Sequence, residues 1–374
     1  MRFQEALKRL AVATCFLLIQ TWANAWGVSD FLPGTPTSGK IAKYAFKLKE
    51  DFPITSVAVS RDGRFLAASS TQNNSLDIWN IQERRTVRRL KLVAPNPYFH
   101  SLAFSPDSKY LALCDGTGAL QIYEASSGAL DHTQREQGQV LCNSRVAYSD
   151  DGAQLAVSGK DFSVLNTRDW TIIKKIDSTW SRGKNLQHFV FLPGTYDLVI
   201  GGSDHFPEFA GQRDAPSGGV YWQLAAADLV PQLRVTVYPV ARGRTFNSGV
   251  NAIAASPNGK LIATGADTGA GIPSQRITDA VKIIDCQSDR VVANPLNGIA
   301  SGEQEALEFT PDGNFLLTEF NAGGDARLNL IETKTFSIVD SFGVHGRVRD
   351  IAAAKRGSVA AAIDKEIIFW QLIN

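Results

Sequence analysis

Residues 60–63 read Ser-Arg-Asp-Gly, and variants of this phrase recur along the 374-residue chain. A typical copy begins with a small polar residue, which is often followed by proline. An acidic or amide residue and a glycine come next, and an apolar run follows the glycine. The copies are Ser60 to Gly63, Ser105 to Ser108, Ser149 to Gly152, Leu192 to Thr195, Ser256 to Gly259, Thr310 to Gly313 and Ala354 to Gly357. Their starts lie 45, 44, 43, 64, 54 and 44 residues apart. A period of about 40 to 45 residues is typical of the four-stranded blades of a β-propeller.

A short apolar strand is predicted on each side of the phrase, as at 57–59 and 65–68. Between the two strands, proline presets the first φ angle of a turn, Asp or Asn bonds to the local backbone, and glycine accepts the positive φ that closes a hairpin. This turn chemistry explains the acidic and amide positions without any ligand. We therefore interpret the phrase as a structural turn.

Each repeat continues into a third strand that ends in an apolar, often aromatic residue followed by a polar one. These pairs are Trp79-Asn80, Tyr123-Glu124, Leu165-Asn166, Trp222-Gln223, Ile284-Asp285, Ile331-Glu332 and Trp370-Gln371. Over about residues 40 to 374 the chain resembles divergent bacterial WD40-like β-propellers, whose third strand ends in Trp-Asp, and the equally loose YVTN-type repeats. Three of the pairs keep the tryptophan, and one, with Asp285, keeps the aspartate. The resemblance implies a fold, and propellers of this kind serve many purposes.

The two ends of the chain predict closure of the ring. The last repeat stops at Asn374, directly after its third strand, and residues 41–48 can supply the missing outermost strand. Such pairing removes two exposed sheet edges. The sequence therefore predicts one all-β domain over residues 40–374, a seven-bladed β-propeller closed by pairing of an N-terminal strand with the last blade. One domain of this length is reasonable because each blade packs only on its neighbours.

Residues 1–25 have the features of a cleavable secretory signal peptide. A basic start with Arg2, Lys8 and Arg9 is followed by an apolar run from Leu10 to Ile19 and by a small-residue cleavage site that ends at Ala25. The apolar run is too short to span a bilayer. We expect a periplasmic or secreted protein without a membrane span, in which residues 26–39, rich in Pro, Gly, Ser and Thr, form a flexible leader.

The charge balance gives no reason to expect a nucleic-acid partner. Removing residues 1–25 removes three basic residues and one acidic residue, which changes the net charge from +1 to −1. A nearly neutral protein is not steered toward nucleic acid or anionic membranes. We expect a monomer with a protein or peptide partner in the cell envelope.

Cysteines and histidines offer few candidate sites. Cys114 ends a second strand and Cys142 precedes a first strand near the same face, so a disulfide between them is possible in an exported protein. Cys286 is expected to be a buried free thiol. His100, His188 and His345 precede first strands of blades that are far apart in the ring, which favours ordinary hydrogen bonding over a metal site.

Motifs for catalysis or cofactor binding are mostly absent from the sequence. There is no CxxCH haem-attachment motif, no HExxH zinc motif and no GxSxG nucleophile elbow. We therefore predict no cofactor, no metal and no assigned catalytic residue.

The uneven spacing of the repeats predicts a binding surface. The two longest repeats carry insertions between their second and third strands, at 203–219 and 267–279, and both are expected on one rim of the ring. Long loops on a rigid scaffold commonly bind partners. Guanidinium groups beside aromatic rings suit an acidic or aromatic partner. The candidate binding residues are His205, Phe206, Phe209, Arg213, Arg242, Arg244, Phe246 and Arg276. Alternatively, these loops pack on each other and their charges are simply solvated.

Two functions remain open at this point. The first is an exported, non-catalytic propeller scaffold that binds a protein or peptide through the insertion rim of blades 4 and 5. The second is an enzyme, because the YVTN-type resemblance extends to lactonase-like hydrolases and to the large subunits of quinone-dependent amine dehydrogenases, which act at or above the central channel. Asp204, His205, Arg242 and Glu303 are the nearest catalytic candidates for that alternative. A buried polar cluster at the channel mouth would favour it.

Overall fold

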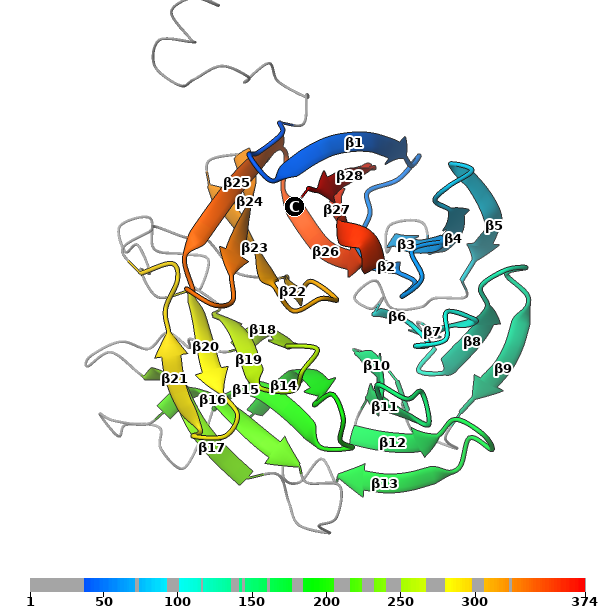
Figure 1. The fold of residues 1–374 in the computed structure, drawn as a ribbon. Coiled ribbons are helices and arrows are strands. Elements are labelled where there is room, and N and C mark those ends of the chain that lie inside the picture. The colour runs from blue at the N-terminus through cyan, green and yellow to red at the C-terminus, as the bar shows by residue number, and fades with distance from the viewer. Residues whose placement is uncertain are drawn as a thin grey trace, which may run out of the picture.

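The computed structural model describes residues 37–70, 74–92, 101–115, 117–135, 141–142, 145–159, 162–176, 184–204, 216–223, 232–239, 250–266, 280–297, 306–322 and 325–373. These residues form seven four-stranded antiparallel sheets, which we call blades 1 to 7. Figure 1 shows the blades standing around a central axis. The all-β propeller fold predicted from the repeats is confirmed.

Blades 1 to 3 follow the chain in order, each running from its innermost to its outermost strand. Blade 1 contains β2 (Ser56–Val59), β3 (Phe65–Ser70), β4 (Ser75–Asn80) and β5 (Arg85–Lys91). Blade 2 contains β6 (Leu102–Phe104), β7 (Tyr110–Cys114), β8 (Leu120–Glu124) and β9 (Leu130–Gln134). Blade 3 contains β10 (Val146–Tyr148), β11 (Gln154–Ser158), β12 (Phe162–Asn166) and β13 (Ile172–Ile176).

Blades 4 to 6 repeat the same order. Blade 4 contains β14 (Lys184–Phe191), β15 (Leu198–Asp204), β16 (Pro216–Gln223) and β17 (Gln232–Pro239). Blade 5 contains β18 (Val250–Ala255), β19 (Leu261–Ala266), β20 (Val281–Asp285) and β21 (Arg290–Ala293). Blade 6 contains β22 (Leu307–Phe309), β23 (Phe315–Ala322), β24 (Asp325–Glu332) and β25 (Ile338–His345).

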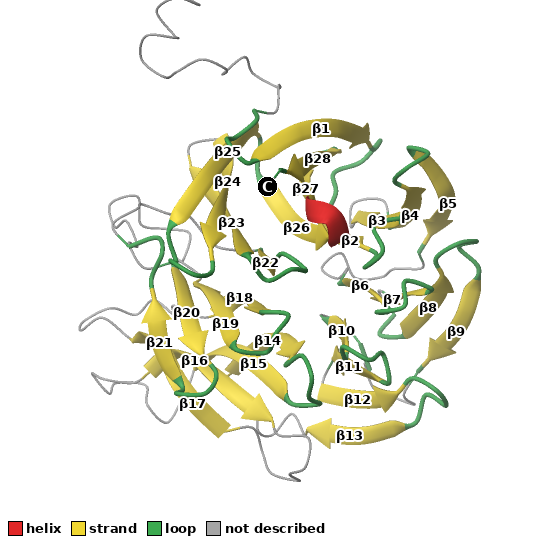
Figure 2. Cartoon of the chain, viewed as in Figure 1, coloured by secondary structure: helices red, strands yellow, loops and turns green. Residues whose placement is uncertain are grey.

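Blade 7 closes the ring with both ends of the described chain. It contains β26 (Val348–Ala354), β27 (Ser358–Ile363), β28 (Glu366–Leu372) and, as its outermost strand, β1 (Ala42–Lys49). The register runs from Ala42 opposite Leu372 to Lys49 opposite Glu366. The predicted pairing of an N-terminal strand with the last blade is therefore confirmed. The described helical structure is one 3-10 turn, η2 (Lys355–Gly357), between β26 and β27 (Figure 2).

The recurring phrase forms the turn that its chemistry predicts. In blade 1 the Ser60 hydroxyl donates to Asp62 Oδ1 at 2.7 Å and accepts from the amide of Phe65 at 2.9 Å. Gly63 has φ +74° and donates its amide to the carbonyl of Ser60. The same Ser or Thr to Asp or Asn contact recurs in blades 2, 3, 5 and 6. These carboxylates and this amide are used inside the turn, as the structural interpretation requires.

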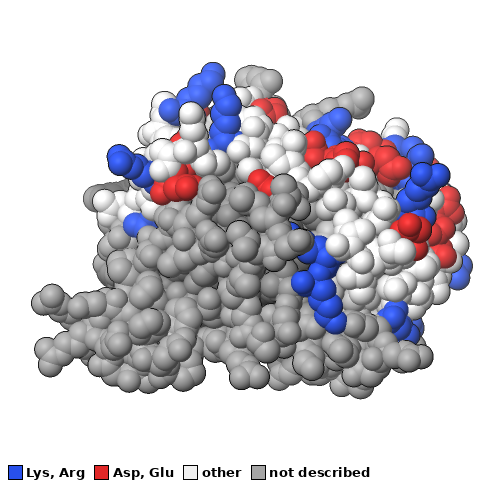
Figure 3. Space-filling view, turned by 90° about the horizontal axis from the view of Figure 1, so that it is seen from below, with Lys and Arg blue, Asp and Glu red and all other residues white. Residues whose placement is uncertain are grey.

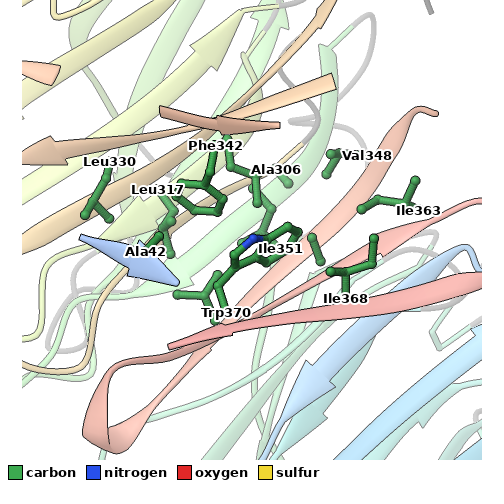
Figure 4. Close-up of a cluster of buried hydrophobic side chains, with 13 residues drawn as sticks. Ala42, Ala306, Leu317, Leu330, Phe342, Val348, Ile351, Ile363, Ile368 and Trp370 are labelled. Atoms are coloured by element: carbon green, nitrogen blue, oxygen red, sulfur yellow. The ribbon is translucent and has the colours of Figure 1, made fainter. Parts of the chain in front are cut away.

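Apolar side chains fill the interfaces between neighbouring blades. Between blades 6 and 7, thirteen buried residues form one cluster, in which the rings of Phe342 and Trp370 lie 5.0 Å apart (Figure 4). The indole of Trp370 is 1% exposed and donates to the carbonyl of Thr37 at 3.1 Å. The tryptophan at the end of the third strand thus joins the blade interface to the chain that precedes β1.

The predicted leader is bound to the propeller at its described end. The amide of Thr37 donates to the carbonyl of Gly343 in β25, and the amide of Gly343 donates to the Thr37 hydroxyl. Residues 37–39 are therefore bound to blade 6 through hydrogen bonds of Thr37. Residues 1–36, with the predicted signal peptide, lie outside the described residues.

Cys114 and Cys142 form a disulfide with a Cα–Cα distance of 5.2 Å. Both residues are fully buried, in a cluster between blades 2 and 3. Cys286 is a half-buried free cysteine, and burial raises the pKa of its thiol to about 11. It is therefore a thiol, not a thiolate, at neutral pH.

The first predicted insertion is shorter than expected. Both flanking strands extend into the segment 203–219, so that Ser203 pairs with Gly218 in the β15–β16 hairpin. Pairing satisfies backbone groups that a loop would leave to water. Residues 205–215 and 267–279 lie outside the described residues.

Candidate functional site in the central channel

A cavity of about 440 Å³ occupies the centre of the ring. Residues on or next to the innermost strand of each blade line it: β2, β6, β10, β14, β18, β22 and β26. These strands contact one another in sequence, and β26 contacts β2, so the wall is continuous. We call this cavity the central channel.

One position per blade forms a layer of the channel wall. The fourth residue before each recurring turn lines the cavity in every blade, and these residues are Ser56, Ser101, Arg145, His188, Ala252, Ala306 and Asp350. Four of the seven are Ser or Ala. The other three are an arginine, a histidine and an aspartate, from blades 3, 4 and 7. Because side chains alternate along a strand, the residue two positions later also faces the channel. There, blade 6 carries Glu308.

Asp350 is bound to the neighbouring blade. Its Oδ2 accepts from the Ser56 hydroxyl at 2.7 Å and from the amide of Val57 at 2.9 Å, and its Oδ1 accepts from the amide of Ile351. These contacts join blades 7 and 1. The Asp350 carboxylate therefore stabilises the contact between two blades and also lines the channel.

Arg145 is fixed through its backbone only. Its amide donates to the Ser158 hydroxyl at 2.9 Å, and its carbonyl accepts from the amide of Ser158 at 3.0 Å. Among the described residues, its guanidinium has no hydrogen-bond or ion-pair partner. The side chain is half-buried and lines the cavity.

Two further channel groups lack protein partners within the described part of the chain. His188 Nδ1 is buried without a hydrogen bond, and the carboxyl of Glu308 makes none either. Arg349, next to Asp350, is exposed where it lines the cavity. Buried polar groups in proteins are normally hydrogen-bonded, so these groups indicate a site that holds solvent or a ligand.

Burial and mutual charge shift the pKa values of these groups. Burial, with the nearby Arg145 charge, lowers the pKa of His188 to about 3. Burial and the Asp350 charge raise the pKa of Glu308 to about 8, against the opposing effect of Arg145. Burial also raises the pKa of Asp350 and lowers that of Arg145. At neutral pH the channel thus holds a neutral imidazole and a mostly protonated Glu308, beside Asp350 and the guanidinium groups of Arg145 and Arg349.

This channel cluster was not predicted from the sequence. The sequence contained one signal for it, because the fourth residue before the turn is small in four blades and ionisable in three. Of the predicted histidines, only His188 has a described side chain, and it lies inside β14 instead of preceding it.

The residues predicted from the insertions have no described geometry. His205, Phe206, Phe209, Arg213, Arg242, Arg244, Phe246 and Arg276 all lie outside the described residues, as do the enzymatic candidates His205, Arg242 and Glu303. Asp204 is the last residue of β15. The described strands do show where the undescribed segments attach: 205–215 follows β15, 240–249 precedes β18, and 267–279 follows β19.

Within the described ranges, no group of three or more His, Cys, Asp or Glu side chains is arranged to hold a metal ion. The same residues contain no helix that is long and apolar enough to cross a membrane.

Comparison with known families supports the repeat assignment. The family model described as WD domain, G-beta repeat, matches residues 43–80 and 240–270. The first match runs from β1 to the end of β4, and the second includes β18 and β19. A search of curated proteins finds no matching sequence. The repeat matches and the ring of four-stranded sheets together identify this chain as a WD40-like β-propeller protein.

Proposed function

We propose that the protein is an exported, non-catalytic scaffold that binds a protein or peptide partner through one rim of the propeller. The rim is defined by the segments 205–215, 240–249 and 267–279. The observation that carries the proposal is the attachment of these segments. In an antiparallel blade, the link that enters the first strand and the turn that joins the second strand to the third lie at the same end of the strands, on one face of the ring. All three segments attach at that end of the strands, in the adjacent blades 4 and 5.

Rigid display is the proposed mechanism. Paired strands and buried blade interfaces fix the ends of each segment, which limits the ordering entropy that binding there would cost. The segments contain His205, Phe206, Phe209, Arg213, Arg242, Arg244, Phe246 and Arg276, which supply aromatic and guanidinium contacts. On the side shown in Figure 3, acidic and basic side chains of the described residues are interspersed. That distribution favours recognition by shape over attraction by net charge.

Export is part of the same proposal. The basic, apolar and small-residue regions of 1–25 have the order of a signal peptide. The Cys114–Cys142 disulfide supports an oxidising compartment, because such bonds persist mainly outside the cytosol. The periplasm or the exterior of a bacterial cell would then hold the protein as a monomer.

Affinity capture from the envelope fraction of the source cells tests the scaffold function. A variant with 205–215 replaced by a short Gly-Ser linker should lose the captured partner. The matched control is Arg61→Ala, at the opposite edge of blade 1, where Arg61 pairs with the exposed Asp150 at 3.0 Å. The control should retain the partner. Equal capture by both variants, with equal folding by circular dichroism, would contradict binding through this rim.

The channel cluster favours a second candidate function, an enzyme resembling the lactonase-like or amine-dehydrogenase-like propellers. Such an enzyme needs converging ionisable groups, and Arg145, His188 and Glu308 meet that requirement without protein partners. Lactone hydrolysis and dye reduction by the purified protein test it. Activity that His188→Gln abolishes would support the enzyme, and inactivity toward both substrate classes would leave the scaffold.

A further inference from the structure

We infer that the central channel binds a small organic acid, with Arg145 as the contact for its carboxylate. This inference is independent of the rim proposal, because it uses only residues on the innermost strands. It also requires no reaction of the bound molecule.

Packing of the blades does not require ionisable side chains in the channel. Blades 5 and 6 place Ala252 and Ala306 at the position that holds Arg145 in blade 3, and the ring still closes. A guanidinium placed there is partly desolvated, which costs free energy unless a partner offsets it. Asp350 and Glu308 act on this charge electrostatically, but no described group hydrogen-bonds the guanidinium, so its N–H donors are left to water or to a solute in the channel.

The groups that face the cavity favour an anionic ligand. Asp350 already accepts three hydrogen bonds, from the Ser56 hydroxyl and from two backbone amides. Glu308 and His188 are mostly neutral at pH 7, since burial raises the pKa of Glu308 to about 8 and lowers that of His188 to about 3. The cationic groups that line the cavity are Arg145 and the exposed Arg349, and Arg145 is the one that is half-buried without a hydrogen-bond partner among the described residues. Its planar fork of N–H donors matches a carboxylate.

The channel also limits the charge and the size of the ligand. The carboxyl groups of Glu308 and Asp350 share the channel with Arg145, so a second negative charge on the ligand would meet repulsion. A monoanion is therefore favoured over phosphate or another dianion. A volume of about 440 Å³ lies in the range of small-molecule sites. Protonated Glu308 and the neutral imidazole of His188 can hydrogen-bond a hydroxyl or carbonyl beside the carboxylate of the ligand.

Calorimetric titration of the purified protein at pH 7 with acetate, lactate, benzoate and inorganic phosphate tests the inference. We expect at least one carboxylate to bind saturably with one-to-one stoichiometry and at least tenfold more tightly than phosphate. Arg145→Ala should weaken that binding at least tenfold, and Arg145→Lys less. Arg61→Ala, a matched loss of an arginine outside the channel, should leave it unchanged.

A second measurement needs no variant. Phenylglyoxal modifies accessible arginines, and mass spectrometry can compare Arg145 with Arg61 in the presence and absence of the tightest carboxylate. We expect selective protection of Arg145. The inference is overturned if no carboxylate binds, if phosphate binds as tightly, or if bound carboxylate leaves Arg145 as reactive as before. Because the rim segments do not enter this experiment, its failure would not affect the scaffold proposal.

Discussion

Asp340 holds the strand that closes the ring, and its removal should loosen that strand. It lies in β25 and is 7% exposed. Its carboxylate accepts from the amides of Lys40, Ile41 and Ala42 at 2.8, 2.6 and 2.8 Å. One carboxylate of blade 6 therefore anchors the start of the outermost strand of blade 7.

The magnitude follows from these contacts. A hydrogen bond to a charged group contributes roughly 1.5–3 kcal/mol, and a buried amide left without a partner costs about 1–3 kcal/mol. Ala42 is fully buried, whereas the amide of the exposed Lys40 can turn to water. We therefore expect Asp340→Ala to lower the free energy of unfolding by roughly 3–5 kcal/mol. Asp340→Asn keeps one acceptor oxygen and should lose about half as much.

Urea unfolding and amide hydrogen exchange measure this effect. Exchange should accelerate over Ala42–Lys49 and the paired Glu366–Leu372 before the other blades respond. The control is Lys47→Ala on the same strand, because the exposed Lys47–Glu366 ion pair at 2.7 Å should contribute less than about 1 kcal/mol. If Asp340→Ala proved no more destabilising than Lys47→Ala, the anchoring role of the carboxylate would be wrong.

Three further outcomes are expected from urea unfolding. Between pH 4.5 and about 8, Glu308 is protonated in the folded chain but ionised in the unfolded chain. The free energy of unfolding should therefore fall as the pH rises through that range, and Glu308→Gln should make this fall smaller. The neutral form of His188 is favoured by folding, so its contribution is present above pH 6.5 and lost as the pH falls toward 3; His188→Gln should reduce that acid loss. The double variant Cys114→Ser, Cys142→Ser opens a loop of 28 residues and should lower the free energy of unfolding by roughly 3–4 kcal/mol, whereas a reducing agent should not affect the variant further.

The fold was predictable because the same local chemistry is repeated. Each turn phrase fixes a hairpin through a hydroxyl, a carboxylate or amide and a residue with positive φ, as Ser60, Asp62 and Gly63 show. The length of the β15–β16 hairpin in blade 4 was not predictable. Turn residues do not determine how far two strands stay paired, and here the pairing extends to Ser203 and Gly218.

The channel cluster escaped prediction for a different reason. Arg145, His188 and Asp350 are separated by 43 and 162 residues, and no motif spacing joins them. They meet because the ring places equivalent positions of different blades in one layer. Only an alignment of the repeats on their turns, read across the blades, would have exposed three ionisable residues among small ones.

Comparison of the blades at this channel position shows which side chains the fold requires there. Ser101 accepts from the amide of Val146 in the next blade at 3.1 Å, just as Asp350 accepts from Val57. A serine therefore suffices to join two blades at this position, and an alanine suffices to fill it, as in blades 5 and 6. Neither joining nor filling explains a guanidinium in blade 3. Small residues would close a ring of similar blades equally well, so the arginine in blade 3 serves either the nearby carboxyl groups of Asp350 and Glu308 or the carboxylate ligand inferred above.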